Sequence, residues 1–194
     1  MPTWKEMIEN NPAHSINYAN RWREIAARGD DIVGEARLID AMAERGSKIL
    51  DAGCGQGRLC GYLVSAGHDV AGTDLDPVLI DIARTNVPEA RFYLGDLCVD
   101  PVPETDFDLI VSAGNVMGFL PVSGREQALR TLYDALRSSG RAVIGYGAGR
   151  GWDFQDFLTV ATNSGFVVDS LFSTWTLEPF TQNSDFLVAV LRKP

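Results

Sequence analysis

The stretch KILDAGCGQGRLC, residues 48–60, decides the fold. A short apolar run ends at Asp51, and glycines follow at alternate positions, Gly53, Gly55 and Gly57. Because glycine adopts positive φ and has no Cβ, this loop can turn sharply and leave a flat floor for a ligand. The order predicts strand, tight loop and helix, with a nucleotide-like cofactor at the end of the strand. A turn that merely joins strand to helix is the simpler alternative; the acidic residue and the three spaced glycines favour the cofactor.

Length and composition limit the classes of protein to which this chain can belong. The 194 residues suit one domain with one core, and 45% hydrophobic with 22% charged residues is typical of globular proteins. We expect a cytoplasmic protein with no membrane partner, because no apolar segment has spanning length and the N-terminus lacks the order of a secretion signal. The net charge of −9 and the scattered Lys and Arg argue against nucleic acid as a partner, although a basic patch formed by folding stays open.

The cysteines give no sign of a metal centre. Cys54, Cys60 and Cys98 have no CxxC spacing, and His14 and His68 are the only histidines. We therefore expect neither a metal site nor a disulfide framework. Cys54 lies inside the glycine loop, where it is either a small buried side chain, which we favour, or a reactive thiol.

Helical and strand patterns alternate along the chain. Residues 1–12 are expected to be frayed. Apolar spacing predicts helices at 14–28, 35–44, 57–66, 77–86, 125–137 and 153–162 and strands at 48–51, 68–73, 91–94, 107–113, 141–146, 166–176 and 185–191. Gly140 closes an expected turn at 138–140. The last two strands have no helix between them, so they should form a hairpin, with the final strand antiparallel in one doubly wound sheet.

Polar residues gather where the strands of this sheet end. In such sheets ligands bind outside the carboxyl ends of the strands. Asp74 ends the second strand, where its carboxylate would meet the two hydroxyls of a ribose, while Asp76 before Pro77 is the better helix cap. Asp96 ends the third strand and either accepts from an adenine amino group or stabilises a turn.

The glycine spacing distinguishes between nucleotides. A dinucleotide fold uses GxGxxG, but here Gly57 is only two positions after Gly55. Asp51 would also repel a phosphate and suits a cation. A cofactor that carries an ammonium and a sulfonium, S-adenosylmethionine, matches better.

These motifs resemble the class I S-adenosylmethionine-dependent methyltransferases. The resemblance covers roughly residues 35–194 and is most specific in ILDAGCGQGRL and GTDLDP. It implies a Rossmann-like α/β fold with a seven-stranded sheet of order 3-2-1-4-5-7-6, helices on both faces and the last strand antiparallel. Residues 1–34 would be a tail and a lid helix, and residues 35–194 the methyltransferase domain.

The resemblance also implies the cofactor-binding residues. The glycine loop would hold the methionine part, the acid after the second strand the ribose, and the residues after the third strand the adenine. With the lid helix, the expected set is Asp51, Gly53, Cys54, Gly55, Gly57, Arg58, Asp74, Leu75, Asp96, Leu97, Ala113, Gly114, Asn115, Tyr18 and Trp22.

The acceptor is expected to be a small molecule. Family members that act on amino groups of nucleic acids or proteins often carry Asn/Asp-Pro-Pro-aromatic after the fourth strand, but AGNVMGF has no proline.

Holding acceptor and methyl in line contributes about 7–11 kcal/mol, so a base is not essential. The catalytic candidates are Asn115, Tyr146 and His14; His14 is alternatively a helix cap, and Tyr146 a residue that only lines the site. Aromatic residues either wall an acceptor pocket or fill the core: Trp4, Trp22, Phe119, Trp152, Phe154 and Trp175.

Two other functions stay open at this point. A noncatalytic S-adenosylmethionine sensor or partner subunit would keep the same motifs, and the absence of an obvious base is compatible with it. A nicotinamide oxidoreductase is disfavoured by the glycine spacing. The sequence makes no prediction about the oligomeric state.

Overall fold

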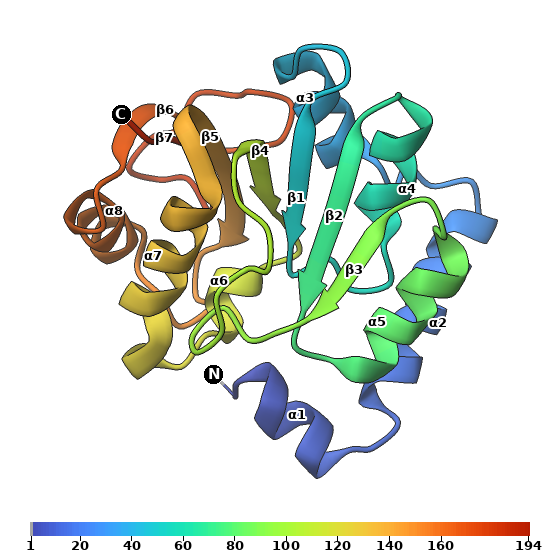
Figure 1. The fold of residues 1–194 in the computed structure, drawn as a ribbon. Coiled ribbons are helices and arrows are strands. Elements are labelled where there is room, and N and C mark those ends of the chain that lie inside the picture. Colours follow the sequence, from blue (N-terminus) through green and yellow to red (C-terminus); the bar gives the residue numbers. More distant parts are fainter. Residues whose placement is uncertain (1) are drawn as a thin grey trace.

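The computed structural model describes residues 2–194 and has a seven-stranded sheet of order β3-β2-β1-β4-β5-β7-β6 (Figure 1). The strands are β1 (Lys48–Ala52), β2 (Asp69–Asp74), β3 (Arg91–Leu94), β4 (Phe107–Ser112), β5 (Leu136–Gly147), β6 (Val167–Phe172) and β7 (Phe186–Arg192). Pairing is parallel except for β7, which is antiparallel to both β5 and β6. The predicted fold class, strand order and final hairpin are confirmed.

Helices cover both faces of the sheet. They are α1 (Trp4–Asn10), α2 (His14–Ala27), α3 (Gly34–Met42), α4 (Arg58–Ser65), α5 (Pro77–Asn86), α6 (Val116–Phe119), α7 (Arg125–Ala135) and α8 (Phe154–Asn163), with a 3-10 turn at Val122–Gly124. Successive strand residues point to opposite faces. Leu50 therefore belongs to the core cluster that includes residues of α7 and α8, and Ile49 to the cluster of α3, α4 and α5. Figure 1 shows these two layers.

The structure corrects two local expectations and adds two short helical elements after β4. Residues 4–10 form a helix instead of a frayed tail, and Thr3 and Glu6 close a capping box at its start. The loop after β4 contains α6 and the 3-10 turn. The turn expected at 138–140 is a bulge within β5, because the pairing with β4 shifts between Phe107 and Leu109.

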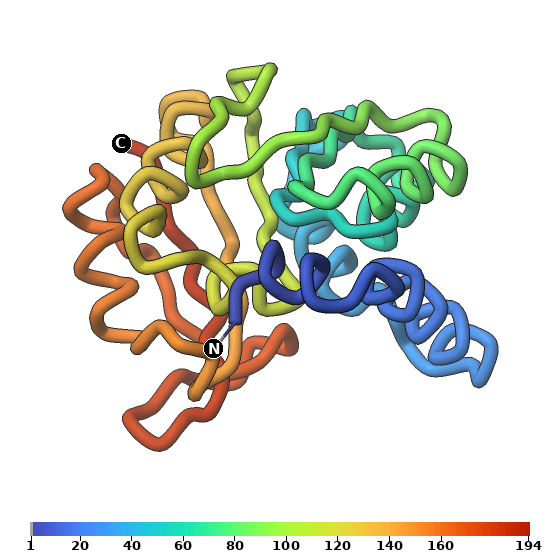
Figure 2. The backbone as a smooth tube through the Cα atoms, turned by 90° about the horizontal axis from the view of Figure 1, so that it is seen from below, coloured from blue at the N-terminus to red at the C-terminus, as the bar shows by residue number. Residues whose placement is uncertain are grey.

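The two N-terminal helices lie near the carboxyl ends of the central strands. Figure 1 places α1 beneath these ends, and Figure 2 shows it crossing that side of the molecule. α2 packs against α5. No helix within residues 2–194 has the length and apolar character needed to cross a bilayer. The boundary between residues 34 and 35 stays a prediction.

Candidate functional site

A cavity of about 320 Å³ lies at the carboxyl ends of the central strands, next to α1. A smaller hollow of about 20 Å³ adjoins it and shares Tyr18, Gly53, Ala113 and Gly114. The remaining lining of the cavity comprises Thr3, Trp4, Lys5, Glu6, Gly55, Thr73, Asp74, Leu75, Leu79, Gly95, Asp96, Leu97, Val116, Phe119, Leu120 and Pro121. The remaining lining of the hollow comprises Trp22, Asp51, Cys54, Gln56, Arg58 and Leu59. The cavity and hollow together match the place predicted for a cofactor.

The glycine loop forms the floor between the cavity and the hollow. Gly53, Gly55 and Gly57 have φ of 85°, 53° and 81°, in the left-handed region that favours glycine. A Cβ on Gly53 would lie 2.3 Å from Cγ2 of Val116, so only glycine permits this approach of the loop to α6. The backbone N–H of Gly53 donates to the carbonyl of Thr73 at 2.8 Å, which fixes the loop to the end of β2. Gly57 itself packs against the core and lines neither space.

Asp74 is held in place by backbone donors. One carboxylate oxygen accepts from the N–H of Gly55 at 2.8 Å and the other from the N–H of Asp76 at 2.9 Å. Burial raises the pKa of Asp74 to about 6. Asp76, not Asp74, caps α5, as the sequence predicts, because its side chain accepts from the N–H of Val78. Asp74 is thereby oriented along the edge of the cavity.

Asp51 lines the smaller hollow and is only 2% exposed. Burial raises its pKa to about 7, against the opposing effect of Arg58. The thiol of Cys60 lies 3.5 Å from its carboxylate. Asp51 and Asp74 therefore border two joined hollows separated by Gly53, and a cation bound there would favour their ionised forms.

Residues of α2 cover the loop. The ring of Tyr18 lies 3.5 Å from the point where a Cβ on Gly55 would be. Arg58 forms two hydrogen bonds to Glu35, at 2.9 and 3.0 Å, and its guanidinium lies 4.2 Å from the ring centre of Trp22. The structure thus brings the predicted lid residue Tyr18 to Gly55 of the loop and Trp22 to Arg58, the first residue of α4.

At the predicted adenine side, Asp96 makes the turn contact, and its role toward adenine stays a prediction. Leu75, Asp96 and Leu97 line the cavity. Asp96 also accepts from the N–H of Cys98 at 2.9 Å, which is the turn contact, and its carboxylate lies 2.6 Å from the ammonium of Lys5. An adenine amino group would share this carboxylate with Lys5.

The three catalytic candidates do not line either space. Asn115 accepts from the N–H of Gly147 at 2.8 Å through its amide oxygen. Tyr146 is fully buried, and its hydroxyl donates to the carbonyl of Asp153 at 3.3 Å. His14 packs against Trp4 with ring centres 4.7 Å apart. The geometry therefore gives these residues structural contacts outside both hollows, and their catalytic role stays a prediction.

Sequence reasoning missed the contribution of α1 and the segment after α6. Thr3, Lys5, Glu6 and Pro121 line the cavity, and the Thr3-x-x-Glu6 capping box was the signal that could have found α1. The six candidate aromatics divide between site and core. Trp4 and Phe119 line the cavity and Trp22 the hollow, whereas Trp152, Phe154 and Trp175 pack in or against the core.

Comparison with known proteins decides the family. A methyltransferase domain model matches residues 49–140. The crystal structure of a TehB-like SAM-dependent methyltransferase from Corynebacterium glutamicum superposes with a TM-score of 0.93 at 66% identity, covering 95% of this chain and 100% of that one. The chain belongs to the class I S-adenosylmethionine-dependent methyltransferases.

Curated relatives match over shorter ranges. A malonyl-[acyl-carrier protein] O-methyltransferase from Serratia marcescens is 32% identical over 56% of this chain and 41% of its own length. A magnesium-protoporphyrin O-methyltransferase from Rhodobacter capsulatus is 35% identical over 42% of this chain and 37% of its own length. The chain thus spans about two fifths of these two methyltransferases.

The site fits the cofactor of the family. S-Adenosylmethionine carries an ammonium and a sulfonium, and two carboxylates, buried Asp51 and half-buried Asp74, border the joined hollows. The amide oxygen of Gln56, which the sequence analysis did not single out, is buried without a hydrogen-bond partner among residues 2–194 and belongs to a residue of the smaller hollow. A buried acceptor without a donor is costly, so a bound ammonium would satisfy it.

Proposed function

We propose that this methyltransferase transfers a methyl group from S-adenosylmethionine to a small-molecule acceptor. The observation that carries the proposal is the pair of joined hollows, with Asp51 on one side of the glycine loop and Asp74 on the other. When bound, S-adenosylmethionine supplies a methyl carbon activated by the neighbouring sulfonium. The chain then has to bind this compound, hold the acceptor in line with it and exclude water.

The proposed binding roles follow from where these residues lie in the two hollows. Asp74 would accept from the ribose hydroxyls, and Asp51 with Gln56 would accept from the ammonium of the methionine part. Leu75 and Leu97 would flank the adenine, while Tyr18 would cover the loop. Each charge-assisted hydrogen bond contributes about 1.5–3 kcal/mol. Since none of the candidate bases lines the cavity, positioning supplies the proposed rate enhancement.

The acceptor is small because the cavity is small and covered. Its volume of about 320 Å³ is at the lower end of the range for ligand sites, and α1 contributes to its lining. The two curated relatives are named for O-methylation of malonyl-[acyl-carrier protein] and magnesium-protoporphyrin. Their names support methylation as the reaction type, while the acceptor of this chain is a separate question.

Incubation with methyl-labelled S-adenosylmethionine and a panel of small metabolites tests the proposal. We expect label in a small product, and we expect the Asp74→Ala variant to form much less of it at low cofactor concentration. Binding of the cofactor without label in any product would instead identify a noncatalytic sensor or partner subunit. Saturable binding of a nicotinamide dinucleotide, without binding of the methyl donor, would point to an oxidoreductase.

Other expectations from the sequence stay predictions. They are a cytoplasmic location, the absence of a nucleic-acid partner, and the role of residues 1–34 as a tail and lid. The position of α1 against the cavity supports the last of these.

A further inference from the structure

Two segments outside the cofactor motifs line one part of the cavity. The first is Thr3–Glu6 at the start of α1, and the second comprises Val116, Phe119, Leu120 and Pro121, in α6 and the two residues after it. They meet where the rings of Trp4 and Phe119 lie 5.6 Å apart. We call the space lined by these two segments the acceptor compartment. The proposed cofactor contacts lie on the glycine loop, Asp74 and Leu97, and Lys5 adjoins the predicted adenine through Asp96, so we place the acceptor beside Trp4 and Phe119.

The compartment has aromatic and apolar walls. The indole of Trp4 packs edge-to-face against Tyr18 at 5.2 Å and against Phe119 at 5.6 Å, with interplanar angles of 83° and 76°. Val116, Leu120 and Pro121 complete the apolar lining. Aromatic edges and faces favour a flat ring as their next neighbour, and ring faces also attract cations.

The charge balance of the cavity is negative. Four of its lining residues are charged: Lys5, Glu6, Asp74 and Asp96. The ammonium of Lys5 is already paired with Asp96 at 2.6 Å. Glu6 accepts from the N–H and the hydroxyl of Thr3 at 2.7 and 3.0 Å, and these bonds lower its pKa, so it stays ionised at neutral pH. Within the lining, therefore, no unpaired cation is available to neutralise an anionic acceptor.

We infer that the acceptor of this enzyme is a flat, apolar molecule that presents an amine nitrogen, and not a carboxylate or a phosphate. This inference rests on the proposed methyl transfer. The amine is bound as its ammonium and first loses a proton to solvent. The uncharged nitrogen then attacks the methyl carbon, so the N–C bond forms while the C–S bond breaks and sulfur keeps the electron pair. The positive charge passes to the nitrogen, which then releases a proton to solvent. Aromatic rings stabilise a positive charge in the compartment, and the solvent-exposed carboxylate of Glu6 adds a weaker attraction that disfavours an anion.

A third curated relative, from Streptomyces venezuelae, is named as an N,N-dimethyltransferase, whereas the two described above are named as O-methyltransferases. The matched part of the two O-methyltransferases covers about two fifths of their length, and the Serratia protein is 32% identical there. The segment at the start of α1 lies outside residues 49–140, which the domain model matches. The acceptor can therefore differ while the cofactor site is shared.

Calorimetry with three probes that share a benzene ring and differ in charge tests the inference. The protein is first saturated with S-adenosylhomocysteine and then titrated with benzylamine, benzyl alcohol or phenylacetate at pH 7.5. We expect benzylamine to bind at least about tenfold more tightly than phenylacetate, with the alcohol between them. Equal or tighter binding of phenylacetate would overturn the inference, as would the absence of measurable binding for all three probes. Failure to bind S-adenosylhomocysteine would overturn the proposed function instead.

Two pairs of variants test whether the preference for an amine arises in the acceptor compartment. Glu6→Gln should reduce the ratio of benzylamine to phenylacetate affinity severalfold, whereas Glu9→Gln, on the same helix but outside the cavity lining, should leave the ratio unchanged. Trp4→Phe and Trp4→Leu both remove the indole N–H, so a further three- to tenfold loss in the leucine variant reports the aromatic ring. Equal effects of Glu6→Gln and Glu9→Gln, or equal affinities of the two Trp4 variants, would contradict the inference.

Discussion

At the scale of single residues, Asp51 and Asp74 are two carboxyl groups whose pKa lies close to neutral pH. Burial raises the pKa of Asp51 to about 7 and that of Asp74 to about 6. The folded protein therefore holds protons at these carboxyls more tightly than the unfolded chain, in which Asp titrates near 3.9. Their contribution to stability is largest in acid and decreases as pH rises from about 4 to about 7.

The affinity for cofactor should depend on pH through the same two groups. A cationic cofactor favours the ionised carboxylates, so binding near pH 5.5 must first displace protons, and the affinity should increase toward pH 8. Titration of S-adenosylmethionine across this range measures the effect. Asp51→Asn should bind more weakly at pH 8 and show a smaller change with pH. A pH-independent affinity in the unmodified protein would contradict this account of Asp51.

Gly53 should not tolerate a side chain. Gly53→Ala places a Cβ 2.3 Å from Val116 at a φ of 85°, whereas Gly29→Ala has a similar φ of 82° and no atom within 4 Å. We expect about 1 kcal/mol of destabilisation for Gly29→Ala from φ alone and about 1–3 kcal/mol more for Gly53→Ala. Denaturant unfolding measures both variants, and equal losses would show that the clash with α6 is relieved without cost.

At the scale of elements, a single buried carboxylate joins the N-terminal helices to α5. Asp76 caps α5 through one oxygen, and its other oxygen accepts from the indole N–H of Trp4 at 2.9 Å and from the hydroxyl of Ser15 at 2.5 Å. The residue is 1% exposed. Since its backbone N–H also donates to Asp74, the position of α1 and α2 is connected to the proposed ribose contact.

Asp76→Ala should therefore cost more than the loss of a cap. Asp153 caps α8 in the same way, through the N–H groups of Gln155 and Asp156, and has no lid contact, so Asp153→Ala is the matched control. We expect about 1 kcal/mol for Asp153→Ala and about 1–3 kcal/mol more for Asp76→Ala, because the donors on Trp4 and Ser15 lose their partner. Hydrogen exchange should accelerate in residues 4–27 for Asp76→Ala alone. Equal protection of this region in both variants would contradict the role of Asp76 in joining α1 and α2 to α5.

The local sequence pattern was sufficient to predict most helices and strands, but it did not predict α1. The bounds of α5 and β3 were predicted to the residue, because Pro77 and the apolar run at 91–94 mark them clearly. α1 is seven residues long, too short to be stable alone, and depends on its capping box and on Trp4 packing over the cavity. The bulge in β5 depends on pairing with β4, which is not a local property of the sequence.

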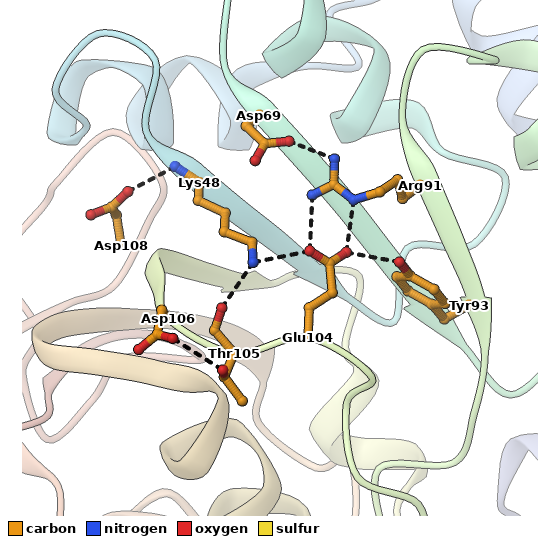
Figure 3. Close-up of polar contacts among 8 residues, drawn as sticks. All are labelled: Lys48, Asp69, Arg91, Tyr93, Glu104, Thr105, Asp106 and Asp108. Atoms are coloured by element: carbon orange, nitrogen blue, oxygen red, sulfur yellow. Dashed lines mark hydrogen bonds and ion pairs between the residues drawn. The ribbon is translucent and has the colours of Figure 1, made fainter.

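At the scale of the whole molecule, stability and function occupy opposite ends of the sheet. Figure 3 shows an ion-pair cluster around Glu104. Glu104 accepts from Lys48 at 2.9 Å, from Arg91 at 2.7 Å and from the hydroxyl of Tyr93 at 2.9 Å, while Arg91 also pairs with Asp69. Lys48, Asp69 and Arg91 are the first residues of β1, β2 and β3, so the cluster joins the amino ends of three strands.

Glu104→Gln should weaken the fold and leave the cofactor site intact. Hydrogen bonds, first of all from Arg91, lower the pKa of Glu104 to about 2. A lowered pKa contributes stability above about pH 4.5 that is lost as pH falls toward 2. We expect the variant to lose about 1–3 kcal/mol at pH 7 and progressively less below pH 4, with unchanged affinity for S-adenosylhomocysteine. An equal loss at pH 7 and pH 2.5 would contradict the ionic origin.

The overall topology was more predictable than the acceptor side of the site. The glycine loop and Asp74 were assigned from motifs, since backbone geometry restricts those positions strongly. Asn115 and Tyr146 were placed at the strand ends, but their side-chain directions depend on the left-handed φ of 66° at Asn115 and on the packing of Tyr146 against α8. The contact between Trp4 and Phe119 joins segments distant in sequence, so only the fold reveals it.

Calorimetric titration of S-adenosylhomocysteine into the unmodified protein, Asp74→Ala and Asp81→Ala tests the central assignment most directly. Asp81 is an exposed carboxylate on α5 outside both hollows, so its variant controls for the change in net charge. We predict saturable binding that weakens about ten- to a hundredfold in Asp74→Ala and is unchanged in Asp81→Ala. Unchanged affinity in Asp74→Ala would contradict the assignment.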